Sequence, residues 1–217
     1  MYATDPELGQ QVRVMLEKAQ VENPIHKNKP LNAKALIRGK FADIMVHLGL
    51  DVMNASIVDT PERVAEMYAN EIFYGLDYNN FPKCTTFERE LDELIMVDDM
   101  ELKSMCEHHW MPIIGRCAVG YIPKGKVMGL SKFNRVVNFF SRRPQIQERL
   151  VEQISLALQV ILDTEDIGVV IRADHYCMKM RGVEDFSAST ITSKMAGRFM
   201  TVPPLREEFL QLSRVTK

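Results

Sequence analysis

The chain has 217 residues, which suggests one domain or one domain with an appendage. Hydrophobic residues make up 46% and charged residues 26%, an ordinary globular composition that excludes a wholly disordered chain. Basic and acidic residues nearly balance. The formal net charge of −2 excludes a protein whose main task is to coat nucleic acid or an anionic membrane, but not a local basic pocket for a phosphorylated small molecule.

Membrane and export signals are not found in the sequence. No apolar run approaches the ~18 residues that a membrane-spanning helix needs. Residues 1–20 lack the basic-then-apolar pattern of a secretory signal, so a cytoplasmic location is expected. In that reducing compartment the cysteines are expected to be metal ligands or buried apolar groups rather than a disulfide framework. There are four: Cys84, Cys106, Cys117 and Cys177.

Residues 1–85 are predicted to form a helical N-terminal region. Apolar residues at steps of three and four predict one helix across residues 8–19 and a second across residues 36–48, ending at Gly49. A third helix is predicted to begin at Thr60, which can cap it, with Pro61 in its first turn. Its expected buried face consists of Val64, Met67, Tyr68 and Ile72, and a loop is expected across residues 75–82.

Residues 86–217 are predicted to form a second unit with strands. Strands are expected at residues 94–97, 102–105 and 113–122, followed by a helix N-capped by Ser131 and another that opens after Pro144. Further strands are expected at residues 167–178 and 187–195. This order predicts an α+β fold in which helices pack on one face of a mainly antiparallel sheet.

Cysteines and histidines gather in two short windows, Cys106-Glu107-His108-His109 and His175-Tyr176-Cys177. Two residues separate Cys106 from His109, the spacing with which a metal knuckle directs two donors to one ion. If residues 175–177 are extended, the two donors of the second window share a face. Thiolate and imidazole donors favour Zn²⁺ over Mg²⁺ or Ca²⁺.

Spacing alone does not show which of the five cysteines and histidines in these windows are metal ligands and which are acid–base groups. A structural zinc normally has four protein ligands, whereas a catalytic zinc keeps one position open. An inert core and a purely structural zinc therefore stay open as alternatives at this point. A zinc nucleotide deaminase is excluded, because its H-x-E and P-C-x-x-C motifs do not occur in the sequence.

A basic group lies on the predicted helices. Ser131, Lys132 and Arg135 cluster at a helix start, where backbone N–H groups and cations can hold phosphate, although basic residues on a helix are commonly its solvated face. Gln147 and Glu148 begin the next helix. A glutamate carboxylate can accept two hydrogen bonds from the edge of a guanine ring, and it also suits the first turn of any helix.

These segments together resemble the GTP cyclohydrolase I family. The resemblance extends over about residues 35–200 and is carried by EIFYGLDYNNFP (71–82), CEHH (106–109), YIPKGKVMGLSKFNRVVNFF (121–140), RPQIQERL (143–150) and HYCMKMRG (175–182). It implies the tunnelling fold for residues 86–217, with the zinc and GTP sites in that region. It also implies a homodecamer with active sites at subunit interfaces, and GTP as the small-molecule partner rather than nucleic acid or membrane.

The resemblance also implies roles for individual residues. One Zn²⁺ per subunit would be held by Cys106, His109 and Cys177, with His108 and His175 in proton transfer. Substrate contacts would be made by Arg63 (from a neighbouring subunit), Ser131, Lys132, Arg135, Gln147, Glu148 and Arg181. The implied reaction is zinc-dependent hydrolysis of GTP at C8, with formate release and rearrangement to 7,8-dihydroneopterin triphosphate, the first step of tetrahydrofolate and pterin biosynthesis.

Two departures from the family pattern and one competing function accompany this resemblance. Trp110 follows CEHH where a smaller or different apolar residue is expected, and Glu184 adds negative charge after Arg181. Neither position is an implied ligand or acid–base group. The non-enzyme alternative is a tunnelling-fold purine-binding or scaffold protein with a structural zinc. The presence of His108 and His175, neither required as a ligand, argues for catalysis.

Overall fold

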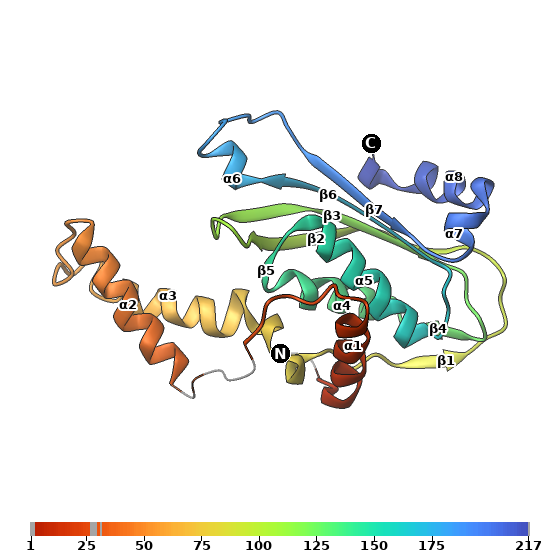
Figure 1. Ribbon diagram of the computed structural model, residues 1–217, viewed down its shortest axis with the longest axis horizontal. Helices are drawn as coiled ribbons and strands as arrows, with labels where there is room; N and C mark the ends of the chain where they lie inside the picture. Colours follow the sequence, from red (N-terminus) through yellow and green to blue (C-terminus); the bar gives the residue numbers. More distant parts are fainter. Residues whose placement is uncertain (1–2, 27–29, 31, 217) are drawn as a thin grey trace.

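The computed structural model describes residues 3–26, 30 and 32–216 (Figure 1). The helices are α1 (Pro6–Lys18), α2 (Ala33–His47), α3 (Thr60–Glu66), α4 (Ser131–Ser141), α5 (Gln147–Leu162), α6 (Tyr176–Lys179), α7 (Arg198–Thr201) and α8 (Pro203–Leu212). A π-helix η1 (Met67–Ile72) follows α3, and the 3₁₀ turns are η2 (Tyr74–Leu76), η3 (Tyr78–Asn80) and η4 (Arg214–Thr216). The strands are β1 (Thr86–Glu88), β2 (Ile95–Cys106), β3 (Pro112–Tyr121), β4 (Lys126–Met128), β5 (Pro144–Gln145), β6 (Ile167–His175) and β7 (Thr190–Met195).

A five-stranded sheet in the order β5-β2-β3-β6-β7 is the centre of the fold. The pairs β2–β3, β3–β6 and β6–β7 are antiparallel, whereas β5 runs parallel to β2. The expected mainly antiparallel sheet is confirmed. The two short strands expected before residue 106 are wrong: they form one strand, β2, with a register shift between Val97 and Met100 where Asp99 has a positive φ of 56°.

Helices α4 and α5 cover one face of the sheet, as expected, and α5 contacts both β6 and β7 (Figure 1). Alternate residues of β6 point to opposite faces: Val169 and Ile171 enter the core under α5, whereas Val170 enters a second, smaller core. That second core includes Phe199 of α7 and Phe209 of α8. The expectation of helices on one face only is therefore incomplete, because the C-terminal helices cover part of the other face.

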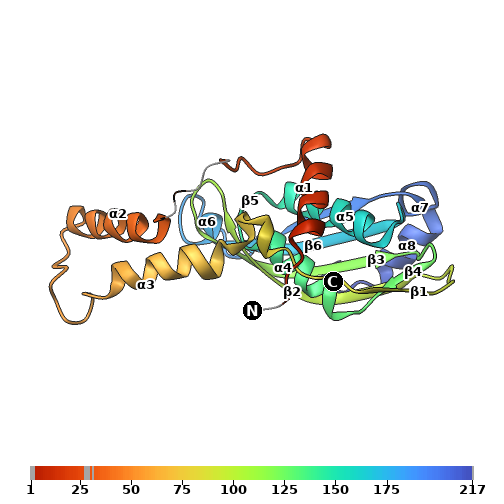
Figure 2. The same cartoon turned by 90° about the horizontal axis from the view of Figure 1, so that it is seen from below.

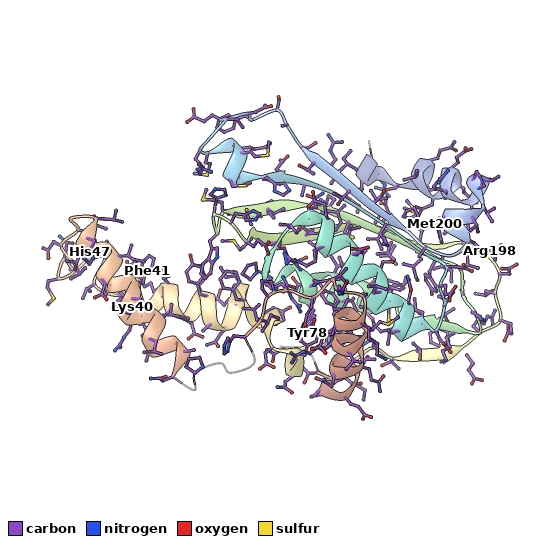
Figure 3. All side chains as sticks on the ribbon, in the orientation of Figure 1. Lys40, Phe41, His47, Tyr78, Arg198 and Met200 are labelled. Atoms are coloured by element: carbon purple, nitrogen blue, oxygen red, sulfur yellow. The ribbon has the colours of Figure 1, made fainter. Side chains whose placement is uncertain are left out.

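The N-terminal helix α1 packs on this core against α5 and η3 (Figure 2). Val12 and Leu16 are fully buried there, beside Tyr78 and Phe81. Tyr78 is labelled in Figure 3 next to α1. The proposed division of the chain at residue 85 stays a prediction, although α1 shares the core of the strands that follow.

Helices α2 and α3 form an arm that extends beyond the sheet (Figures 1 and 2). They contact each other, and Lys40, Phe41 and His47 of α2 lie far from the sheet in Figure 3. On α2, only Met45 is buried, whereas Leu36, Ile44 and Leu48 of its expected apolar stripe are exposed. The expected buried face of the third helix is only half-buried; Ala65 and Phe73 are the buried apolar residues there.

Several local boundaries differ from the sequence predictions. Thr60 and Ser131 are the first residues of their helices, and Asp59 and Leu130 occupy the N-cap positions. The expected loop across residues 75–82 contains the turns η2 and η3. Strand β6 ends at His175, so Cys177 lies in the helical turn α6 and not in a strand. None of the helices in the described part of the chain is long and apolar enough to cross a membrane.

Candidate metal centre

A tight turn at the end of β2 places the first two metal donors. The backbone N–H of Trp110 donates to the Cys106 carbonyl at 2.8 Å, and the N–H of Cys106 donates to the Met111 carbonyl at 2.8 Å. Trp110 has a positive φ of 52°, which turns the chain back into β3. His109 is thereby directed back toward the side chain of Cys106.

Cys106, His109 and Cys177 form one compact group whose candidate ligand atoms all lie within 4.8 Å of one another. Cys106 Sγ lies 3.9 Å from His109 Nδ1. Cys106 is buried, Cys177 is half-buried and His109 is exposed. Burial raises the pKa of the Cys177 thiol, and its hydrogen bond with Cys106 raises that pKa further.

Arg181 contacts the same group from the loop after α6. Its Nη1 lies 2.9 Å from His109 Nε2, and because a guanidinium only donates, Nε2 must be the acceptor in this contact. A neutral imidazole has one unprotonated nitrogen. A metal bound at Nδ1 would place the proton on Nε2, so metal binding at Nδ1 and this arginine contact exclude each other.

His108 lies outside the three-donor group and faces solvent, with a side chain 65% exposed. Its Nε2 lies 3.8 Å from Oε1 of Glu107, whose carboxylate also accepts from the Arg149 guanidinium of α5. A small cavity of about 280 Å³ lies beside it, lined by Asn23, Pro24, Ile25, Leu76, Glu107, His108 and Pro144. His108 is therefore free to meet a ligand from solvent.

His175 is held at the end of β6 by a buried partner. Its Nε2 lies 2.8 Å from Oε1 of Gln147, the first residue of α5, and Gln147 is 1% exposed. Partial burial lowers the pKa of His175, while the carboxylates of Glu148 and Asp174 oppose that shift. Glu148 itself is exposed on the same helical turn.

The other residues implied in substrate binding lie elsewhere in this chain. Ser131, Lys132 and Arg135 occupy the start of α4, whereas the end of that helix leads into β5, which pairs with Cys106. An 11-residue helix rises about 15 Å from its first residue to its last. Arg63 is on the arm and is exposed. Direct contacts thus join Arg181 to His109 and Gln147 to His175. Ser131, Lys132 and Arg135 lie toward the other end of α4, and Arg63 lies on the arm.

A separate hollow of about 320 Å³ lies between η1 and α4. Arg135 and Arg142 line it together with Glu71 and three asparagines, Asn70, Asn80 and Asn138. None of the three metal donors lines this hollow. It extends along α4 from Arg135 to Arg142, and Ser131 and Lys132 do not line it.

Two features near the metal group were missed in the sequence. The Glu107–Arg149 ion pair joins the turn after β2 to α5. Only one indication of it was present in the sequence, which is that Glu107 lies in the CEHH motif and Arg149 in the RPQIQERL motif. Trp110 packs edge-on against Tyr68 and Phe73, with ring centroids 5.4 and 4.9 Å away. Trp110, which the family pattern did not lead us to expect, therefore packs the turn after β2 against η1 and the residue that follows it.

A mainly antiparallel sheet thus carries, after the ends of β2 and β6, a Cys–His–Cys group that could hold a metal ion. His108 and His175 are its neighbours in the sequence. The sequence model of the GTP cyclohydrolase I family matches residues 37–214. GTP cyclohydrolase 1 of Aeromonas salmonicida (strain A449) is 51% identical over 204 residues, covering 92% of this chain and 93% of its own. GTP cyclohydrolase 1 of Vibrio cholerae serotype O1 is 46% identical over 203 residues, covering 92% and 94%.

The chain therefore belongs to the GTP cyclohydrolase I family and is an enzyme of that family. Among solved structures, the archaeosine synthase QueF-Like in its apo form matches 50% of this chain and 97% of its own, at 15% sequence identity and a TM-score of 0.42. A likeness at that level has no bearing on function.

Proposed function

We propose that this enzyme hydrolyses GTP at C8 in a zinc-dependent reaction, releases formate and rebuilds the rings as 7,8-dihydroneopterin triphosphate. The observation that carries the proposal is the three-donor group with His108 and His175 beside it, in a chain that belongs to the GTP cyclohydrolase I family. The product would enter tetrahydrofolate and other pterin-forming pathways as their first intermediate. A cytoplasmic location stays a prediction.

The donor chemistry supports zinc held by Cys106, His109 and Cys177. Two sulfurs and one imidazole are soft and borderline donors of the kind that select Zn²⁺, and within the described residues the group has three members rather than the four of a closed structural site. When bound, zinc acts as a Lewis acid that makes water nucleophilic near neutral pH. Binding through Nδ1 of His109 would also release Arg181 to meet an anionic substrate.

The two remaining histidines supply proton transfer. His108 is exposed on the metal-binding turn, so it can meet the guanine ring and protonate N7, which makes C8 open to attack. His175 then assists ribose opening, before the Amadori rearrangement and ring closure. Imidazole is the side chain that most often serves as a general acid or base in enzymes.

Guanine and triphosphate would be recognised by different parts of the surface. Glu148 is exposed next to His175 and offers a carboxylate to the N–H edge of guanine, while Arg181 and the basic start of α4 offer charge to phosphate. Phosphate binding far from the reacting atom would anchor the base in place for reaction. Arg63 would add to this charge from a neighbouring subunit.

The separation of these groups supports active sites shared between subunits of a homodecamer. Within one chain the start of α4 lies about 15 Å along the helix from the end near Cys106. This separation supports a site to which a second copy contributes its own α4 or arm. Strand β7 is at the open edge of the sheet, and the arm exposes Leu36, Ile44 and Leu48. Open edges and exposed apolar helices are surfaces that association covers.

The test is incubation of the zinc-loaded protein with GTP. We expect formate in solution and, after oxidation, a fluorescent pterin in equal amount. Intact GTP with neither product would refute the proposal. A His108→Ala variant that kept full activity would remove the role given to that histidine and leave the rest standing.

A further inference from the structure

We propose that Gln147 is a positioning residue that holds His175 in the tautomer with its proton on Nε2, and is not a contact to the substrate. This inference rests on the proposed function, in which His175 exchanges a proton. It assigns Gln147 a role that differs from the substrate contact implied by family resemblance. The role follows from the partners of the Gln147 side chain and from its position under the sheet.

The orientation of the Gln147 amide is fixed by its neighbours. Its Nε2 donates to the carbonyl oxygens of Ile171 (3.2 Å) and Thr190 (3.1 Å) and to Thr192 Oγ1 (3.1 Å). A flipped amide would place Oε1 against two carbonyl oxygens that cannot donate to it. The flip is therefore excluded, and Oε1 must face His175.

The orientation of the amide in turn fixes the proton on the histidine ring. Gln147 Oε1 is only an acceptor, so His175 Nε2, at 2.8 Å, must donate to it. In the neutral ring this leaves Nδ1 with the lone pair. Any proton that His175 takes from or returns to the substrate must then pass through Nδ1, because Nε2 is already engaged.

Both polar side-chain atoms of Gln147 are engaged by neighbours within the chain. Its amide nitrogen has three acceptors, its oxygen has one donor, and the residue is 1% exposed. These contacts also tie the start of α5 to β6 and β7 where the two strands begin to separate, beyond the Ala173–Thr190 pair. The adjacent Glu148, in contrast, is exposed and can face a ligand.

The test compares Gln147→Met with Thr192→Val in the zinc-loaded, full-length protein. Methionine keeps the length and volume of glutamine but offers no acceptor of similar strength to His175. Valine removes one partner of the same amide and leaves the contact with His175. Pterin and formate are measured separately with GTP as substrate, and His175 is observed by ¹⁵N resonances of histidine-labelled protein, assigned with His175→Asn.

We expect wild type and Thr192→Val to hold the His175 proton on Nε2. Gln147→Met is expected to populate the other tautomer and to lower pterin formation by at least ~10-fold, because a positioned acid–base group contributes ~10²–10⁴-fold. Formate release should fall much less, since His108 serves that step, and the KM for GTP should stay within ~2-fold of wild type because no substrate contact is lost.

Four results would overturn the proposal. The first is a wild-type His175 with its proton on Nδ1, a measurement that stands even if Gln147→Met does not fold. The second is a Gln147→Met protein with an unchanged tautomer. The third is a Gln147→Met protein in which pterin and formate fall in parallel. The fourth is a large rise in KM with unchanged kcat, which would mark a substrate contact. If wild type releases neither product from GTP, the proposed function fails, while the tautomer still decides the positioning role.

Discussion

Asn23 donates from its side-chain amide to Oε1 of Gln145 at 3.2 Å, joining the N-terminal segment to the short strand that pairs with Cys106. The Asn23 side-chain oxygen, Oδ1, accepts from Arg143 Nη1 at 3.3 Å and from Gln153 Nε2 at 2.9 Å. All four of these side chains are buried. Since the family match begins at residue 37, this network connects a segment outside that match to the support of the metal-binding turn.

Asn23→Ala is therefore expected to destabilise the protein by about 1–3 kcal/mol, because it removes one of the two acceptors of each of the buried donors Arg143 Nη1 and Gln153 Nε2. For a chain of this size, each kcal/mol lowers Tm by roughly 2–4 °C, which thermal unfolding can measure. Asn134→Ala, at an exposed position of α4, is the matched control and should change stability by less than about 0.5 kcal/mol. Equal losses in the two variants would contradict the role of the network.

The same network includes a fully buried cation. The Arg143 guanidinium lies 4.7–5.1 Å from the ring centroids of Tyr78, Phe139 and Phe140, and burial lowers its pKa. Among the described residues no hydrogen-bond acceptor meets its Nε or Nη2. Because Arg143 and Asn23 share one contact, Asn23→Ala and Arg143→Met should couple by about 0.5–3 kcal/mol in a double-mutant cycle. Strict additivity of the two losses would show that the contact has no energetic weight.

Two glycines are expected to respond in opposite directions to alanine. At Gly39, inside α2, a Cβ meets nothing within 4 Å, so Gly39→Ala should raise stability by roughly 0.5–1 kcal/mol through helix propensity. At Gly75, a Cβ would lie 2.1 Å from the Phe139 carbonyl oxygen and 2.8 Å from that of Arg142. Gly75→Ala must therefore displace η2 from the end of α4, and a loss of more than about 2 kcal/mol is expected. Denaturant unfolding of both variants distinguishes them, and losses of similar size would refute the steric argument.

The joint between α2 and α3 is expected to depend on pH. Lys34 Nζ lies 2.7 Å from Glu62 Oε1 and 2.6 Å from Glu66 Oε2, and these contacts lower the pKa of Glu66 below its ordinary 4.5 and raise the pKa of Lys34 above 10.5. Glu66 thus contributes stability above pH 4.5 that is lost as pH falls through its lowered pKa. Lys34 contributes stability below pH 10.5 that is lost as pH rises through its raised pKa.

Lys34→Met should accordingly lower Tm slightly at pH 7 and not at all at a pH where Glu66 is protonated. The effect should also shrink in high salt, since both side chains are exposed and screened. Lys40→Met, which removes a 3.6 Å pair with Asp43 inside α2, is the control for loss of a surface lysine. A Lys34→Met effect that stayed constant from pH 7 to pH 3 would show that its ion pairs do not hold the arm.

The fold was predictable wherever one apolar period dominates the sequence. Helix α5 and strand β6 are long and regular, so their positions follow from spacing alone. Strand β2 was divided in two because Asp98 and Asp99 interrupt its pattern, and a bulge absorbs them within one strand. The C-terminal helices were missed since Phe199 and Phe209 are isolated aromatics, whose burial depends on a sheet face that spacing does not describe.

The candidate site was predictable in composition but only partly in geometry. The grouping of Cys106, His109 and Cys177 agrees with the ligand set that the motifs imply. The argument that His175 and Cys177 share a strand face is wrong, because the strand ends at His175 and Cys177 reaches the site from a helical turn. The burial of Gln147 could not be foreseen, since its partners Ile171, Thr190 and Thr192 lie on strands distant in the sequence.

The four cysteines offer a matched test of the metal centre. Burial raises the pKa of the Cys84 thiol to about 12 and that of the Cys117 thiol further, which favours the protonated thiol in both. Neither belongs to the three-donor group. Cys84→Ser and Cys117→Ser should therefore retain about one zinc per chain after dialysis, with Cys117→Ser bearing the larger stability cost of a hydroxyl in the core.

Cys106→Ser and Cys177→Ser are expected to lose that zinc, and with it formate release from GTP. Removing a hydrogen-bond partner of a ligand typically weakens metal binding by ~10–100-fold, so loss of a ligand itself should exceed that range. Elemental analysis of all four variants, beside circular dichroism to verify folding, measures the difference directly. Zinc retained by a folded Cys177→Ser protein, or lost by Cys84→Ser, would place the metal elsewhere. Only the substitution of a zinc ligand is expected to lower the amount of zinc bound.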